Sequence, residues 1–128
     1  MNIHIRQPVE FEKIIDDPHI HCIELTRHRM AVQQLLDSRD NDCSLMVRLK
    51  EYIQCFDSIV RKINPVKKLL KQPNFHWAID NKSVQSSCWK FEAIVPRVVL
   101  AQLCQMESEK CIKEGQYVEA GKSLRLSI

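Results

Sequence analysis

The alternation of apolar and polar positions is most regular between residues 45 and 63. Six apolar residues recur there at spacings of four and three, which places them on one face of a helix. They are Leu45, Leu49, Tyr52, Phe56, Ile59 and Ile63. Asn64 and Pro65 follow, and a proline disfavours the helical conformation in the residue before it. We therefore predict a long amphipathic helix that ends at Asn64.

A second helix is predicted from about His19 to Asp37. Its apolar face is interrupted once, by Arg29. The polar run at 37–42 separates it from the next helix and supplies that helix with an N-cap residue. Two long helices joined by a short polar loop are expected to form an antiparallel hairpin. The apolar positions of the second helix are Cys22, Leu25, Val32 and Leu36.

Shorter or less regular elements surround this hairpin. Residues 3–6 alternate as in a short strand or extended arm, and residues 8–15 resemble a short helix. A helix is predicted from about Ser83 to Lys113, with a break near Pro96, because an interior proline costs about 3 kcal/mol. Residues 115–128 resemble the start of a further helix. The apolar positions expected on one face of the helix with the break are Phe91, Ile94, Val95, Val98, Val99, Leu103 and Met106.

The stretch from Phe75 to Glu92 concentrates large aromatic rings in a chain that has few of them. Phe75 and Trp77 begin it, and Trp89 and Phe91 end it. Rings of this size contribute strongly to a core or an interface. We expect a short extended segment whose rings pack between helices, and a turn with a helix start at 81–83.

Composition favours helices over strands. Only two glycines occur in 128 residues, and the tight turns of a hairpin-rich β fold usually need glycine. The length is typical of one domain. The sequence therefore predicts a single all-α domain, an antiparallel helical array with a short extended N-terminal arm.

Charge is unevenly distributed along the chain. The net charge is +3, but residues 61–97 hold eight Lys and Arg against two Asp and Glu. Such a segment suits anionic lipid, phosphate or an acidic peptide, whereas single-stranded nucleic acid prefers aromatic rings interleaved with the basic residues on an open face. This leaves one alternative function, a small basic helical module that binds anionic membrane or nucleic acid, with nucleic acid the less favoured. The candidate contacts are Arg61, Lys62, Lys67, Lys68 and Lys71.

Catalytic and metal-binding patterns are weak. His19, His21 and Cys22 form the densest cluster of ligand types, but the second ligand pair of a zinc site is missing. No glycine-rich phosphate loop is present, and the six cysteines fit reduced core residues of a cytosolic protein. No apolar run reaches the roughly 20 residues of a membrane span. We expect no enzyme activity, no cofactor, no metal and no transmembrane segment.

Several short motifs, in order, carry a family resemblance. A helix with an "L..LR..A" character stands at 24–31, and one with an "L..YY.QL" character stands at 49–56. An "F-x-W" segment follows at 75–77, then "FE" at 91–92 and an apolar run at 98–103. Together they resemble the N-terminal third of the BRO domain of Alix, Brox and the rhophilins. The sequence departs from the family pattern at Pro96, Arg97 and Val99.

The resemblance implies an adaptor related to endosomal sorting, in the cytoplasm or at endosomes. In that family an amphipathic C-terminal helix of an ESCRT-III subunit docks in an apolar groove. The groove belongs mainly to helices beyond the matched segment, so the resemblance implies an incomplete BRO-like domain and assigns no binding residue. The positions that match the family motifs are expected in the core. They are Tyr52, Phe75, Trp77, Phe91 and Glu92.

Overall fold

The computed structural model describes residues 2–17, 21–39, 41–62 and 69–113. In order, these residues form β1 (Ile3–Ile5), the short 3-10 helix η1 (Phe11–Lys13), α1 (Cys22–Ser38), α2 (Asp42–Lys62), β2 (Phe75–Ile79), β3 (Lys82–Ser86) and α4 (Trp89–Lys113). The three strands form one antiparallel sheet in the order β1-β2-β3. The fold is therefore mixed helix and sheet, and the prediction of an all-α domain is wrong.

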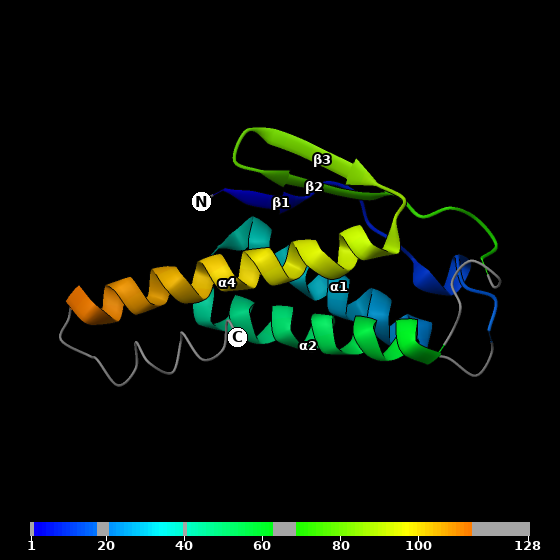
Figure 1. Ribbon diagram of the computed structural model, residues 1–128, viewed down its shortest axis with the longest axis horizontal. Coiled ribbons are helices and arrows are strands. Elements are labelled where there is room, and N and C mark those ends of the chain that lie inside the picture. Colours follow the sequence, from blue (N-terminus) through cyan, green and yellow to red (C-terminus); the bar gives the residue numbers. More distant parts are fainter. Residues whose placement is uncertain (1, 18–20, 40, 63–68, 114–128) are drawn as a thin grey trace.

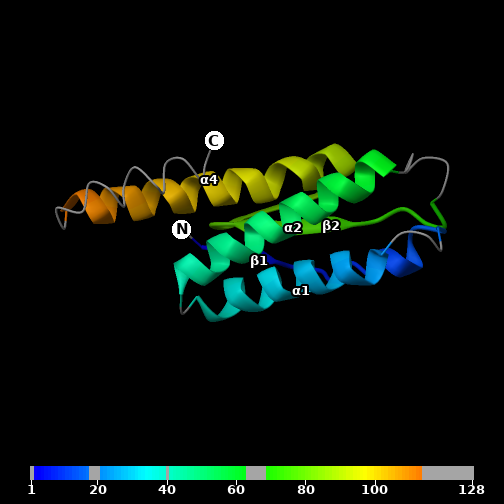
Figure 2. The same ribbon diagram turned by 90° about the horizontal axis from the view of Figure 1, so that it is seen from below.

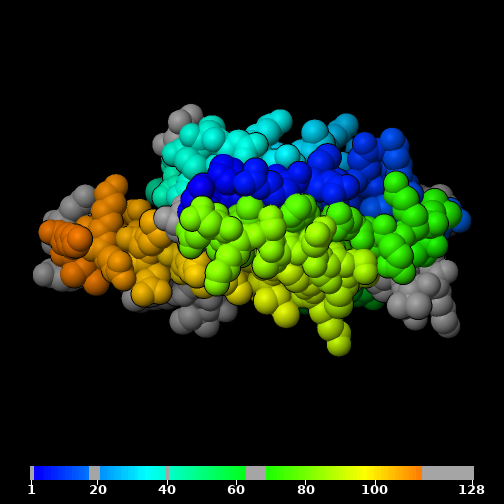
Figure 3. Space-filling view, turned by 90° about the horizontal axis from the view of Figure 1, so that it is seen from above, coloured from blue at the N-terminus to red at the C-terminus, as the bar shows by residue number. Residues whose placement is uncertain are grey.

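The long helices form one layer, and the sheet lies over one side of it (Figure 1). Seen from below, α2 lies between α1 and α4 and packs against both (Figure 2). The outer side of the sheet shows β1 beside the β2–β3 hairpin, with the C-terminal half of α4 extending past them (Figure 3). The core includes the side chains of Phe11, Leu49, Phe56, Phe75 and Trp77.

The α1–α2 hairpin confirms the prediction from helical periodicity. The five described apolar positions of α2 that were predicted to share a face are all buried, and so are the four of α1. Arg39 ends α1 in the left-handed conformation, and the Asn41 side chain accepts a hydrogen bond from the amide of Ser44 at 3.2 Å, which caps α2. Ile63, the sixth position of the stripe, lies outside the described residues.

The β2–β3 hairpin was not expected. Residues 81–83, interpreted as a helix start, instead complete the turn and begin β3, where Val84 pairs with Trp77 and Ser86 with Phe75. The turn needs no glycine, because Asp80 adopts the positive φ of 55° that tight turns require and Asp tolerates. The scarcity of glycine therefore did not exclude a hairpin.

Helix α4 is continuous through Pro96, so the predicted break is wrong. Pro96 has no N–H to donate to the carbonyl of Glu92, and its ring is buried. The neighbouring Arg97 guanidinium donates to the carbonyl of Ala93 at 2.6 Å. Burial of the proline ring thus accompanies the missing backbone hydrogen bond.

Two further expectations are corrected. Only residues 11–13 of the predicted helix at 8–15 are helical, because the backbone of Ile14 and Ile15 pairs with residues 69 and 70 instead. The apolar residues of α4 do not share one face, since Ile94, Val98 and Met106 are exposed. Predictions for residues 114–128 fall outside the described part of the chain.

Candidate interaction surface

The carboxylate of Glu92 lies at the centre of a buried polar network that joins four elements. Its Oε1 accepts hydrogen bonds from Tyr52 of α2 at 2.9 Å and from Arg29 Nε of α1 at 3.0 Å. Its Oε2 accepts one from the indole N–H of Trp77 of β2, also at 2.9 Å. Arg29 and Glu92 are each only 1% exposed. A buried carboxylate with three donors, one of them the Arg29 cation, is well satisfied.

Arg29 connects this network to the N-terminal segment. Its Nη1 donates to the backbone carbonyl of Gln7 at 2.8 Å, while its guanidinium carbon lies 5.9 Å from the ring centroids of Phe75 and Trp77. Cation–π attraction thus adds to the ion pair. Among the described residues, nothing pairs with its buried Nη2. Burial, with the Glu92 carboxylate close by, raises the pKa of Tyr52 well above its usual value, so this phenol stays protonated and donates.

Most of the positions that match the family motifs lie in the interior of the protein. Tyr52, Phe75, Trp77 and Glu92 are buried, and Phe91 is half-buried against the core. These positions were expected in the core, but the role of Arg29 was not, because Arg29 reads in the sequence as an interruption of the apolar face of α1. An arginine on the apolar face of a helix needs a buried anion, and Glu92 of the same sequence supplies it. The network is closed to solvent, so it can support a site but cannot hold a substrate.

An open apolar hollow lies between the C-terminal end of α2 and the N-terminal end of α4. Its volume is about 320 Å³, at the small end of the range for ligand pockets. Phe56 and Val60 line it from α2, and Trp89 and Ala93 line it from α4. Charged residues also line it, namely Asp57, Arg61 and Lys90. We call this the α2–α4 hollow.

Aromatic stacking forms the floor of the α2–α4 hollow. The Trp89 ring stacks on Phe56 at 5.7 Å with an interplanar angle of 26°, and it also contacts the rings of Phe75 and Phe11. Its buried indole N–H has no hydrogen-bond partner in the described part of the chain. An unpaired buried donor costs about 1–3 kcal/mol. The rings beneath the hollow are therefore packed against one another, while one buried donor among them is left unsatisfied.

The structure describes only three of the five residues of the predicted basic patch. Arg61 and Lys62 are exposed at the end of α2, whereas Lys67 and Lys68 lie outside the described residues. Lys71 is also exposed, but it lines a separate hollow with Glu10, where its charge helps to lower the pKa of that carboxyl, after the larger effects of Lys13. Arg61 and Lys71 thus line different hollows.

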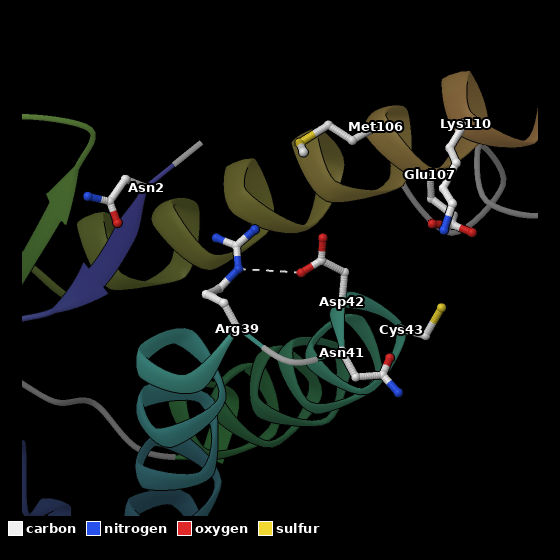
Figure 4. Close-up of a pocket in the computed structure, with 8 residues that line it drawn as sticks. All are labelled: Asn2, Arg39, Asn41, Asp42, Cys43, Met106, Glu107 and Lys110. Carbon is white, nitrogen blue, oxygen red and sulfur yellow. Dashed lines mark ion pairs between the residues drawn. The ribbon is translucent and has the colours of Figure 1, made fainter. Parts of the chain in front are cut away.

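A larger depression of about 740 Å³ lies where the α1–α2 turn meets the C-terminal half of α4 (Figure 4). Its lining mixes both signs of charge. Arg39 pairs with Asp42 at 3.4 Å from the turn, while Glu107 and Lys110 reach in from α4. Because these charges largely offset one another, the depression favours no ligand of one sign.

The described residues offer no sign of catalysis by metal or thiolate. No three His, Cys, Asp or Glu side chains among them come together to hold a metal ion, and His19 of the weak zinc motif is not described. All six cysteines are described, and none of them forms a disulfide. Burial raises the pKa of Cys22, Cys55 and Cys104, which disfavours the reactive thiolate. None of the described helices is both long and apolar enough to cross a membrane.

The fold and the hollow define a small mixed helix-and-sheet module with a charged but closed centre and an open apolar surface. Comparisons of the chain with protein families, with curated proteins and with solved structures found no match. The resemblance to the BRO domain therefore rests on the sequence motifs alone.

Proposed function

We propose that the chain is a non-enzymatic protein-interaction scaffold that binds a helical segment of a partner, as in the endosomal-sorting adaptors it resembles. The observation that carries this proposal is the α2–α4 hollow. It leaves the half-buried apolar surfaces of Val60 and Trp89 open between two helices, with the buried ring of Phe56 beneath them, which suits the helix-in-groove mode of recognition. A location in the cytoplasm or at endosomes is part of the same proposal.

The buried network supports the proposal indirectly. Glu92 ties α4 to α1, α2 and β2, so the two helices that line the hollow are held in fixed relation. A preorganised surface loses less conformational entropy when a partner binds.

The test is fluorescence anisotropy of a labelled C-terminal helix from an ESCRT-III subunit, titrated with the chain at low and high salt. A peptide of the same composition but scrambled order, which lacks an apolar face, is the matched control. Binding of the native helix that persists at high salt, with none for the scrambled peptide, is the expected result. Absence of binding by a protein that unfolds cooperatively contradicts the proposal.

The alternative is a basic module for anionic membrane or nucleic acid that acts through residues 61–71. The exposure of Arg61, Lys62 and Lys71 favours it. Binding to phosphate groups weakens steeply with salt, whereas apolar docking responds little. Binding of anionic vesicles or of single-stranded DNA that disappears at moderate salt, without binding of the helix, selects this alternative.

A further inference from the structure

We propose that the α2–α4 hollow recognises an acidic amphipathic segment of a partner protein, with a bulky apolar side chain against Trp89 and Phe56 and flanking carboxylates on Arg61 and Lys90. This inference rests on the proposed function and adds the place and the chemistry of recognition. It follows from the lining of the hollow, from the charges at its rim and from the half-exposed ring of Trp89.

The apolar part of the hollow determines which kind of ligand side chain can enter it. The stacked rings of Phe56 and Trp89 line it together with Val60 of α2 and Ala93 of α4. Its volume is about 320 Å³, which leaves space for a side chain to enter. A leucine- or phenylalanine-sized group fills such a space and removes apolar surface from water.

The rim selects the charge of the ligand. Arg61 and Lys90 are exposed, and no carboxylate among the described residues pairs with either of them. The single acid at the rim, Asp57, is already paired with Arg97. The rim thus presents two cations without counter-charges, a complement to carboxylates on a partner.

The position of Lys90 strengthens this argument. Arg61 and Lys62 lie in the last turn of α2, where cations suit the negative end of the helix dipole. Lys90 lies in the first turn of α4, where the dipole is positive and a cation is unfavourable. Helix stability therefore explains Arg61 but does not explain Lys90, whereas an acidic ligand explains both.

Trp89 adds a built-in reporter. Its ring is half-exposed in the hollow, whereas its indole N–H is buried, so a docked segment meets the ring and not the N–H. The other tryptophan, Trp77, is fully buried and already donates to Glu92. A change in tryptophan emission on binding therefore reports on Trp89.

The test uses three fluorescein-labelled synthetic helices. The first has a leucine face flanked by glutamates, the second has the same leucine face flanked by lysines, and the third keeps the glutamates but replaces the leucines by serine. We expect the first to bind and to shift tryptophan emission, and the other two to bind about tenfold more weakly or worse. Trp89→Phe is expected to remove the emission change.

A charge reversal gives the sharper result. In the R61E/K90E variant we expect the lysine-flanked helix to bind better than the glutamate-flanked one, an inversion of the wild-type preference. R6E/K82E is the matched control, because it reverses the same number of exposed cations, one directly after β1 and one in β3. It is expected to keep the wild-type preference, and melting curves check that both variants fold.

The outcomes separate this inference from the proposed function. If the ESCRT-III helix binds but R61E/K90E and Trp89→Phe leave its binding unchanged, the hollow is not the site and this inference is wrong, while the scaffold function stands. If neither that helix nor any synthetic helix binds the folded chain, the proposed function fails with it. Vesicles of phosphatidylcholine and phosphatidylserine that displace the glutamate-flanked helix through the same two cations contradict the choice of a protein partner.

Discussion

The Glu92 network and the α2–α4 hollow are built from similar parts but in opposite states. Each combines aromatic rings with charged residues, and each receives them from both α2 and α4. In the network, the indole N–H of Trp77 has its acceptor and the charges of Arg29 and Glu92 are paired. In the hollow, the indole N–H of Trp89 has none among the described residues, and Arg61 and Lys90 lack counter-charges. Opposite charges that are paired in the interior stabilise the fold, whereas the exposed cations Arg61 and Lys90 are available to a ligand.

Removal of the Glu92 carboxylate, the centre of the network, is expected to have the largest effect on stability. Glu92→Ala leaves the charge of Arg29 and the donors of Tyr52 and Trp77 buried without their acceptor. Breaking a buried ion pair by removing one partner costs about 3–5 kcal/mol, and the two lost hydrogen bonds add to it, so we expect the largest loss of stability in urea unfolding. Glu24→Ala removes an exposed carboxylate and is the control. Equal stability of the two variants contradicts a structural role for the network.

A double-mutant cycle measures the coupling energy between Arg29 and Glu92. Arg29→Leu alone leaves the Glu92 charge unpaired, but in the Glu92→Ala background it removes a charge that has already lost its partner. We therefore expect the double variant to be more stable than the sum of the two single effects predicts, with a coupling of about 1–3 kcal/mol.

The residue that belongs to both the core and the hollow is Phe56. It is only 2% exposed, and its ring contacts those of Tyr52 and Trp89. Phe56→Ala creates a core cavity and is expected to lower the free energy of unfolding by about 3–5 kcal/mol, with fewer unsatisfied groups than in Glu92→Ala. If the variant melts within a degree or two of wild type, Phe56 does not belong to the core.

Tyr52→Phe tests a single donor of the network. A hydrogen bond to a charged group contributes about 1.5–3 kcal/mol, so we expect a loss of this size near neutral pH. The pKa of Tyr52 is raised in the folded protein, so wild type binds this proton more tightly when folded. Stability from this group is therefore complete below the ordinary tyrosine pKa of about 10 and declines as the pH rises above it. The gap between wild type and Tyr52→Phe should narrow above about pH 10, and a constant gap argues against the raised pKa.

The smallest effect on stability is expected on the outward face of α4. Ile94 is 58% exposed and Val98 is 44% exposed. The variant I94K/V98K should change stability by less than about 0.5 kcal/mol while it lowers the binding of a hydrophobic dye. Val95→Lys is the control, since Val95 is buried one position away and its replacement should destabilise strongly. If I94K/V98K and Val95→Lys destabilise the protein to a similar degree, the side chains of Ile94 and Val98 are buried and the prediction is wrong.

Prediction from the sequence succeeded where one face of a helix packs on the core. The spacing of Leu45, Leu49 and Tyr52 was enough to predict α2, because its pattern depends on the helix period alone. It failed for β3, whose residues are mostly polar and whose turn uses Asp80 in place of glycine. It also failed at Pro96, where tertiary packing outweighs the local preference for a break.

The candidate site was only partly predictable for a different reason. The basic character of Arg61 and Lys62 and the bulk of Trp89 were visible in the sequence. The hollow itself exists only because the end of α2 lies beside the start of α4, and no local pattern encodes that neighbourhood. Similarly, Arg29 and Glu92 are 63 positions apart, so their pairing could be inferred only after α1 and α4 were placed.

The wide separation of the Glu92 partners along the chain has a consequence for how the protein folds. The contacts of Glu92 with Arg29, Tyr52 and Trp77 span 63, 40 and 15 residues. A partly assembled chain that lacks α1 or β2 either leaves Glu92 in water or buries it with donors missing, and both states are unfavourable. Intermediates with a packed core should therefore be scarce, and the high sequence separation of these contacts favours slow folding. The Glu92 carboxylate is thus fully paired in the interior only when α1, α2, β2 and α4 have all packed together.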